Sequence, residues 1–219
     1  MVINKDNRSL INIFGAPIVI FSIINNSIIF INFIFFITLF SFYEYFKLIK
    51  QKSHFTILNT ILGFFWISSI VYLIPIYQSI SYQFILIIFF SVWITDSFAF
   101  IMGKQFGKKK ILPFISPNKT WVGSFSGLLF SMLFILSIFY FYNIFPSYFT
   151  LIDIIIIGFI TGFFSQIGDF LESYFKRKLE VKDSSKLLLG HGGFLDRFDS
   201  FFIVSITLYI YLLINGFLV

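Results

Sequence analysis

The sequence predicts an all-α fold, a polytopic transmembrane helical bundle of about seven spans. Of the 219 residues, 58% are hydrophobic and only 12% are charged, whereas a soluble domain carries about 25% charged residues. A chain of this length has too little interior to hide so much apolar surface from water. We therefore expect lipid to be the solvent for most of the side chains. The chain contains no Cys, which excludes disulfides and thiolate metal sites.

Seven stretches are apolar and approach the length of a spanning helix, which needs about 20 residues. These stretches are 10–24, 28–43, 55–77, 83–102, 121–145, 151–173 and 197–213. The first two are the shortest. They form either a tight helical hairpin around Asn25 and Asn26 or shallow segments that do not fully cross, and we expect the hairpin. Without an internal repeat or a linker, the pattern predicts a single integral membrane domain over residues 1–219.

The positive charges all fall on one side of this seven-span arrangement. The 16 Lys and Arg residues occupy four segments, 5–8, 47–52, 104–119 and 176–197. The loops on the opposite side contain none. The positive-inside rule then places the amino terminus in the cytoplasm and the carboxyl terminus outside. The net charge of +6 is thereby explained by orientation in a membrane, and we expect no nucleic-acid partner.

Membrane topology does not explain the acidic residues near the basic loops. Five carboxylates are expected at one depth on three helices, namely Asp96, Asp169, Glu172, Asp196 and Asp199. A carboxylate at membrane depth costs several kcal/mol and faces a polar cavity by default. Converging oxygen ligands without Cys suit a hard cation such as Mg²⁺. The alternative is that these residues form ion pairs with neighbouring Lys and Arg.

The spacing of polar residues predicts a shared site between the last two spans. Asp169, Glu172, Ser173 and Lys176 fall on one helical face, at i, i+3, i+4 and i+7. A basic segment follows, and then the run Gly190-His191-Gly192-Gly193, whose backbone can approach a ligand and present amide groups. Cations, exposed amides and a metal site together describe a polyphosphate pocket.

A second basic segment with glycines, 103–121, follows the fourth apolar stretch. Taken alone, a Lys run beside a membrane reflects topology or attracts anionic lipid. Next to a polyphosphate pocket, it becomes a candidate site for an anionic headgroup.

The motifs of the carboxyl-terminal half resemble those of phosphatidate cytidylyltransferases, also called CDP-diacylglycerol synthases. The shared elements are S-Y-F-K-R at 173–177, K-D at 182–183 and H-G-G-F-L-D-R-F-D at 191–199. Gly168-Asp169-x-x-Glu172-Ser173 and the segment from Asp96 to Trp121 also fit this family. The similarity covers residues 93–200, which we interpret as the catalytic region between amino-terminal spans (1–92) and the last span (201–219). Leu189, Phe100 and Val122 depart from the family pattern.

The resemblance implies transfer of CMP from CTP to phosphatidate, giving CDP-diacylglycerol and pyrophosphate, with Mg²⁺ alone or together with a monovalent cation. The implied metal ligands are Asp169, Asp196 and Asp199, with Asp96 and Glu172 as second choices. The implied catalytic residues are Lys176, Arg177, Lys182, Asp183, His191 and Arg197. The implied substrate-binding residues are Ser116, Lys119, Thr120, Ser173, Gly192 and Gly193. His191 has a structural role as its alternative, as a hydrogen-bonding residue among glycines.

The same resemblance implies where the protein acts and what it meets. We expect an integral protein of the plasma (inner) membrane with its active site facing the cytoplasm. The expected partners are CTP, phosphatidate and the lipid bilayer, and a homodimer is compatible with the pattern.

Other classes of membrane protein make different demands on the sequence. A CTP-dependent kinase of polyprenol or dolichol would use the same nucleotide on a lipid alcohol, and would release CDP instead of pyrophosphate. CDP-alcohol phosphotransferases are disfavoured, because their D-G-x-x-A-R…G-x-x-x-D run is absent. A transporter would spread its charges through the bilayer and show a matched pair of broken helices, neither of which the sequence predicts.

Overall fold

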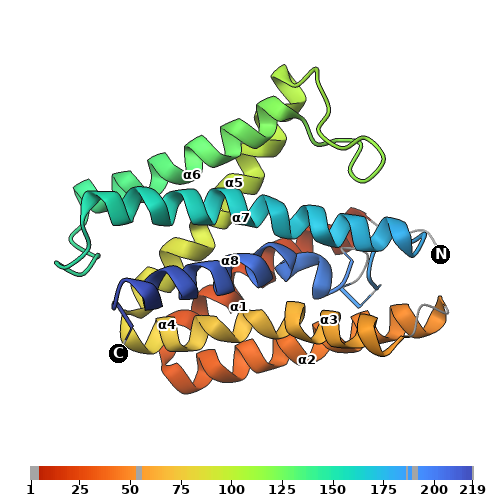
Figure 1. Ribbon diagram of the computed structural model, residues 1–219, viewed down its shortest axis with the longest axis horizontal. Coiled ribbons are helices and arrows are strands. Elements are labelled where there is room, and N and C mark those ends of the chain that lie inside the picture. The colour runs from red at the N-terminus through yellow and green to blue at the C-terminus, as the bar shows by residue number, and fades with distance from the viewer. Residues whose placement is uncertain (1–4, 53–55, 186, 189–191, 219) are drawn as a thin grey trace.

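The computed structural model describes residues 5–52, 56–185, 187–188 and 192–218, with side chains from residue 15 onward. The regular elements of the described chain are helices, and Figure 1 shows them gathered into one elongated bundle. The elements in chain order are α1 (Lys5–Asn25), α2 (Ser27–Gln51), α3 (Ile57–Ser68), the 3₁₀ turn η1 (Ser69–Tyr72), α4 (Leu73–Ser79), α5 (Tyr82–Phe106), α6 (Trp121–Phe141), α7 (Leu151–Lys178) and α8 (Leu195–Ile214).

The predicted transmembrane bundle is confirmed. Among the described residues, six segments are long and apolar enough to cross a membrane: α2, α3 to α4 taken together, α5, α6, α7 and α8. Helix α2 has 25 residues, so the second apolar stretch is not the shallow segment that its apolar length allowed. Helix α1 has 21 residues, and a helix of that size extends about 32 Å, close to the hydrocarbon thickness of about 30 Å. About seven spans therefore remain the best description.

The two ends of the bundle differ in charge. In Figure 1 the start of α1, the α2–α3 connection, the α5–α6 loop and the α7–α8 connection lie at one end of the bundle. The described segments rich in Lys and Arg belong to this end, which we call the basic end. The α1–α2, α4–α5 and α6–α7 connections and the carboxyl terminus lie at the other end. The chain termini are thus on opposite sides, as an odd number of spans requires.

The third span is interrupted, which the apolar pattern did not predict. Between α3 and α4 the backbone tightens into η1, and Pro75 follows within α4. Proline has no N–H to bond the carbonyl four residues earlier, so the regular helical ladder cannot run through this point. The carbonyl of Ser69, at the start of η1, accepts a hydrogen bond of 2.8 Å from the Ser205 hydroxyl, and the Ser69 hydroxyl contacts the Phe202 carbonyl. The interruption therefore joins this span to α8.

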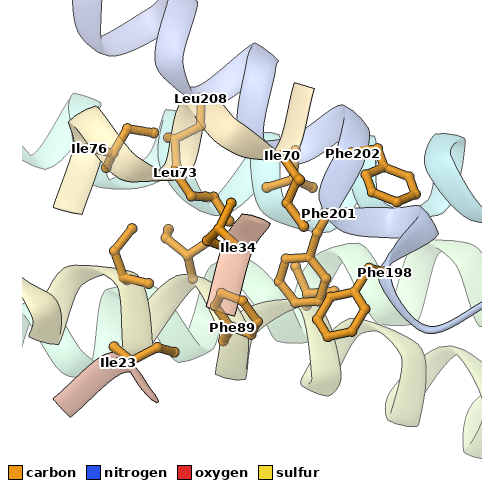
Figure 2. Close-up of a cluster of buried hydrophobic side chains, with 14 of the residues drawn as sticks. Ile23, Ile34, Ile70, Leu73, Ile76, Phe89, Phe198, Phe201, Phe202 and Leu208 are labelled. Atoms are coloured by element: carbon orange, nitrogen blue, oxygen red, sulfur yellow. The ribbon is translucent and has the colours of Figure 1, made fainter. Parts of the chain in front are cut away.

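The buried core joins the amino-terminal helices to α5 and α8. Figure 2 shows Ile70, Leu73 and Ile76 facing α8, with the rings of Phe89 and Phe201 beside one another. These two rings are stacked with centroids 4.2 Å apart. Because lipid is as apolar as these side chains, close van der Waals packing rather than exclusion from water favours the contact.

Hydroxyl groups hold α5, α6 and α7 together inside the apolar bundle. Ser91 of α5 lies 2.8 Å from Ser131 of α6 and 2.9 Å from Thr161 of α7, oxygen to oxygen. All three side chains are buried. Such interhelical hydrogen bonds are common between membrane helices, where the groups have no water to bond. They fix the three helices that form the walls of the site described below.

Helices α7 and α8, like α2 and α5, extend further at the basic end than their apolar stretches predicted. Helix α7 continues to Lys178, so that Lys176 and Arg177 lie in its last turn and not in a loop. Helix α8 begins at Leu195, which places Asp196 in its first turn. Polar residues can continue a helix beyond the lipid, because the backbone bonds do not depend on apolar side chains. Several candidate site residues are consequently held by rigid helix rather than by a loop.

A labelling experiment tests the two-sided arrangement. Because the chain lacks Cys, a single Cys can be placed at exposed Ser147, at the end opposite the basic end, or at exposed Lys108 of the basic end. The positive-inside rule predicts that an impermeant thiol reagent added to intact cells labels the Cys of Ser147→Cys and not that of Lys108→Cys. After the membrane is permeabilised, both should react. Labelling of Lys108→Cys alone in intact cells would reverse the predicted orientation, and labelling of both would contradict the span count.

Candidate functional site

A large cavity opens at the basic end between α5, the α5–α6 loop, the start of α6, and α7. Its volume is about 830 Å³, which lies within the range of about 300–1,000 Å³ for ligand pockets. Lysine and amide side chains are prominent in its lining, with Lys104, Lys110, Asn118, Lys119 and Gln166 among them. A cavity lined in this way can hold an anionic ligand of considerable size.

The α5–α6 loop is folded back on itself. The backbones of Lys110 and Thr120 form an antiparallel bridge, and the Thr120 hydroxyl caps α6 by accepting a 3.1 Å hydrogen bond from the Gly123 amide. Arg177 of α7 donates from Nε to the carbonyl of Ile115 at 3.1 Å, which ties the loop to α7. Thr120 and Arg177, both predicted to act on substrate, therefore have structural contacts in this structure. Thr120 also lines the cavity.

An ion pair joins the α5–α6 loop to α7, the two motif segments that were predicted from the sequence to share one site. Lys119, at the end of the α5–α6 loop, pairs with Asp169 of α7, and its ammonium nitrogen lies 4.1 Å from the centroid of the Phe170 ring. Ser173, one helical turn further along α7, donates to Asp169 at 3.3 Å. Asp96 and Ser116 line the same cavity. The predicted convergence of α5, the α5–α6 loop and α7 is observed.

Three carboxylates meet where α7 and α8 cross. Asp169, Glu172 and Asp199 each offer an oxygen, and these oxygens lie within 4.8 Å of one another. The helices can approach this closely because of Gly168, where a Cβ atom would lie 2.5 Å from the carbonyl oxygen of Asp199. Glu172 is buried, and its Oε1 atom has no hydrogen-bond partner within the described part of the chain.

The donor chemistry of this carboxylate cluster (Asp169, Glu172 and Asp199) fits a hard divalent cation. Carboxylate oxygens are the ligands that Mg²⁺ prefers in proteins. A buried oxygen without a partner costs free energy that a bound cation would recover. The cluster also adjoins the cavity, since Asp169 belongs to both.

Asp196 lies next to the cluster but is held by other groups. Lys176 bridges Glu172 and Asp196, at 2.5 Å and 2.8 Å respectively. Asp196 also accepts hydrogen bonds from the Ser184 amide and hydroxyl, at 2.9 and 2.8 Å, and from the Gly193 amide at 2.7 Å. The ion-pair alternative thus describes this part of the carboxylate set. Asp196 links the α7–α8 connection to α7.

The two described glycines of the run 190–193, Gly192 and Gly193, leave room for the contacts of Asp196 and Glu44. Gly192 has φ +82°, a conformation that L side chains rarely adopt, and a Cβ there would also contact the Asp196 carboxylate. A Cβ at Gly193 would contact the carboxylate of Glu44 and the hydroxyl of Ser184. Because the Gly193 amide donates to Asp196, it is engaged inside the protein rather than directed at a ligand.

The remaining predicted residues that the structure describes, Lys182, Asp183 and Arg197, lie at the basic end. Lys182 and Asp183 are exposed, and neither forms an ion pair with any of the described residues. Arg197 is exposed in the first turn of α8. His191, with Gly190 and Leu189, lies outside the described residues.

Glu44 of α2 is a site-adjacent residue that the sequence analysis missed. It is 1% exposed and accepts hydrogen bonds from residues 184, 185, 194 and 195 of the signature region. The amino-terminal third carries no family motif, so the resemblance implies no role for any residue there. One signal was present, because Glu44 is the only acidic residue between positions 7 and 95.

Comparison of the sequence with known proteins places the chain in a family. Residues 51–215 match the cytidylyltransferase family. A phosphatidate cytidylyltransferase of Staphylococcus aureus (strain COL) is 45% identical over 122 residues, which cover 56% of this chain and 46% of the relative. The phosphatidate cytidylyltransferase of Staphylococcus saprophyticus is 47% identical over 124 residues, with the same coverage of both chains, 56% and 46%. The chain spans about half the length of the curated relatives it matches.

The packing at Gly193 gives a stability test that does not depend on function. Gly193→Ala forces a methyl group against Glu44 and Ser184, and overpacking of this kind costs about 1–3 kcal/mol. Gly15→Ala is the matched control, because a Cβ at this α1 position meets nothing within 4 Å. Thermal unfolding in detergent should show a lower midpoint for Gly193→Ala and an unchanged or higher one for Gly15→Ala. Equal midpoints for the two variants would contradict the packing described here.

Proposed function

The chain belongs to the cytidylyltransferase family, and we propose that it transfers CMP from CTP to phosphatidate, giving CDP-diacylglycerol and pyrophosphate. One observation carries the proposal more than any other. A lysine-lined cavity of about 830 Å³ adjoins the cluster of Asp169, Glu172 and Asp199, and Asp169 with its partner Lys119 belongs to the boundary between them. Relatives with similar sequences carry the name phosphatidate cytidylyltransferase.

The proposed reaction explains why such a site lies at the basic end of a membrane bundle. A phosphatidate phosphate oxygen attacks the α-phosphorus of CTP, a new phosphorus–oxygen bond forms, and the bond to the β-phosphate breaks as pyrophosphate leaves. The nucleophile is already an anion, so no general base is needed. Both reactants are anionic, and phosphoryl transfers of this type depend on positioning and charge neutralisation.

We propose that Asp169, Glu172 and Asp199 hold Mg²⁺, with Asp196 beside them across Lys176. The bound cation would supply neutralisation of the triphosphate charge and of the leaving pyrophosphate. This ligand set differs from the one that the sequence implied. Glu172, a second choice from sequence, lies inside the cluster, whereas Asp196, a first choice, is occupied by Lys176, Ser184 and Gly193.

The described side chains around the cavity have distinct proposed tasks. Lys104, Lys110 and Lys119 would neutralise phosphate oxygens, and Ser116 and Asn118 would donate hydrogen bonds to the same ligand. A charge-assisted hydrogen bond is roughly twice as strong as a neutral one, so these lysines would fix the orientation of an anionic headgroup. Lys182 and Arg197, exposed at the basic end, would attract the nucleotide.

The lipid environment supports the choice of acceptor. The chain is an integral membrane protein, so a substrate with acyl chains reaches it by diffusion within the bilayer. CTP is dissolved in the cytoplasm, and the positive-inside rule would direct the basic end to that side. We propose the plasma (inner) membrane as its location, with the cavity facing the cytoplasm.

An exchange of one carboxylate for its amide tests the proposed metal cluster. Asp169→Asn keeps the shape and removes a charge, and should lower CDP-diacylglycerol formation per folded molecule by at least about 100-fold. Raising the Mg²⁺ concentration should restore part of the loss. The measurement is lipid product formed by purified protein from CTP and phosphatidate, with monodispersity in detergent as the check on folding.

Asp153→Asn is the matched control for this change. Asp153 lies on the same helix, α7, but at its opposite end, where it caps the helix together with Thr150. The side-chain oxygen of Asn can still accept from the Thr150 amide, and the position lies far from the basic end, so this variant should keep near-normal activity per folded molecule. Near-normal activity of Asp169→Asn, or an equal loss in both variants, would remove the support for a metal site at the carboxylate cluster.

A further inference from the structure

Glu44 connects the amino-terminal helices to the signature region through four hydrogen bonds. Its Oε1 atom accepts from the Ser185 hydroxyl at 2.6 Å and from the Phe194 amide at 3.2 Å. Its Oε2 atom accepts from the Ser184 hydroxyl at 3.1 Å and from the Leu195 amide at 2.9 Å. All four donors belong to the α7–α8 connection or to the start of α8, more than 130 positions further along the chain.

The contacts of Glu44 satisfy a need that α8 cannot meet from its own sequence. The first amides of a helix have no partner inside the helix, and a Ser, Thr, Asp or Asn at the cap position normally accepts from one of them. The cap position of α8 is Phe194, which makes no side-chain capping bond. Glu44 therefore acts as the cap from another helix, and its negative charge lies at the end of α8 that carries partial positive charge.

The same contacts place the carboxylates of α8. Glu44 holds the amides of Phe194 and Leu195, and Asp196 is the next residue along the chain. Asp199 lies about one helical turn further along α8. The Ser184 hydroxyl lies within hydrogen-bond distance of both Glu44 (3.1 Å) and Asp196 (2.8 Å), so the two carboxylates share one donor. Gly193 provides the space for this arrangement, since a side chain there would overlap Glu44.

A direct chemical role for Glu44 does not fit these observations. The side chain is 1% exposed, and both of its oxygens are occupied by donors of the chain itself. A charge buried in this way costs free energy that its four hydrogen bonds offset. The carboxylate lines neither the lysine-lined cavity nor the described carboxylate cluster.

We infer that Glu44 is a positioning residue, which fixes residues 184–185 and the start of α8 so that Asp199 meets Asp169 and Glu172. The catalytic consequence rests on the proposed function, whereas the anchoring itself does not. Any cation held by the carboxylate cluster should then bind more weakly when the anchor is lost, although Glu44 touches neither cation nor substrate.

Glu44→Gln is the informative change because every neighbour of the carboxylate is a donor. Whichever way the amide points, its NH₂ group faces one of the two backbone N–H groups, which cannot reverse its role. Glu180→Gln is the matched control, since Glu180 is exposed at the end of α7 and makes no described side-chain hydrogen bond or ion pair. Ser185→Ala removes one donor and provides a milder variant if Glu44→Gln is not recovered folded.

Two measurements on purified protein in detergent test whether Glu44 positions the start of α8. Amide hydrogen exchange in a peptide covering 194–199 should accelerate about ten-fold in Glu44→Gln, while a peptide covering 107–120 stays unchanged. The Mg²⁺ concentration for half-maximal CDP-diacylglycerol formation should rise about ten-fold, as it does when groups behind metal ligands are lost. Glu180→Gln should match the wild type in both, and Ser185→Ala should shift both in the same direction by less.

The outcomes separate the anchor from the proposed reaction. Unchanged exchange in folded Glu44→Gln, or in Ser185→Ala where only that variant folds, would overturn the anchoring. Faster exchange with an unchanged Mg²⁺ requirement would overturn the positioning role and leave a purely structural contact. If the wild type makes no CDP-diacylglycerol, the proposed function fails, and Mg²⁺-dependent protection of 194–199 in wild type but not in Glu44→Gln would still support the inference.

Discussion

The structure depends on one constraint: every charged or polar group within the bundle must find its partner inside the protein, because lipid offers none. At mid-depth the chain meets this constraint with hydroxyl contacts such as Ser91 to Ser131 and Thr161. At the basic end it concentrates carboxylates where Lys119, Lys176 and backbone amides can bond them. Glu172 Oε1, like Ser41 Oγ and Trp66 Nε1, is buried without a described hydrogen-bond partner, and of these three it belongs to the carboxylate cluster.

Helix α7 is the element through which these polar contacts are joined. Asp169 reaches the α5–α6 loop through Lys119, Glu172 shares Lys176 with α8, and Arg177 bonds the loop backbone at Ile115. Gly168 lets α8 cross at close range. A rigid helix that carries the cluster on one face keeps its groups aligned without dependence on loops. Precise positioning of this kind is what a phosphoryl-transfer site requires.

The sequence predicted the helices, the charged end and the convergence of carboxylates there, because hydropathy and helical spacing are local properties. Asp169, Glu172 and Asp199 could be assigned to one depth from their positions in the apolar stretches. The interruption at η1 and the capping of α8 by Glu44 depend on contacts between distant segments, such as Ser69 with Ser205 and Glu44 with Leu195. No local pattern encodes such partners. The occupation of Asp196 by Ser184 and Gly193 was hidden for the same reason.

The central claim is that the carboxylate cluster and the lysine-lined cavity together transfer a cytidylyl group to a lipid phosphate. The most direct test gives the purified protein phosphatidate and Mg²⁺ with CTP labelled at either the α- or the γ-phosphorus, followed by separation of lipid from water-soluble products. The account predicts that α-label enters the lipid as CDP-diacylglycerol while γ-label leaves as pyrophosphate in equal amount. Entry of the γ-label into the lipid fraction, with release of CDP and no α-label in lipid, would contradict it.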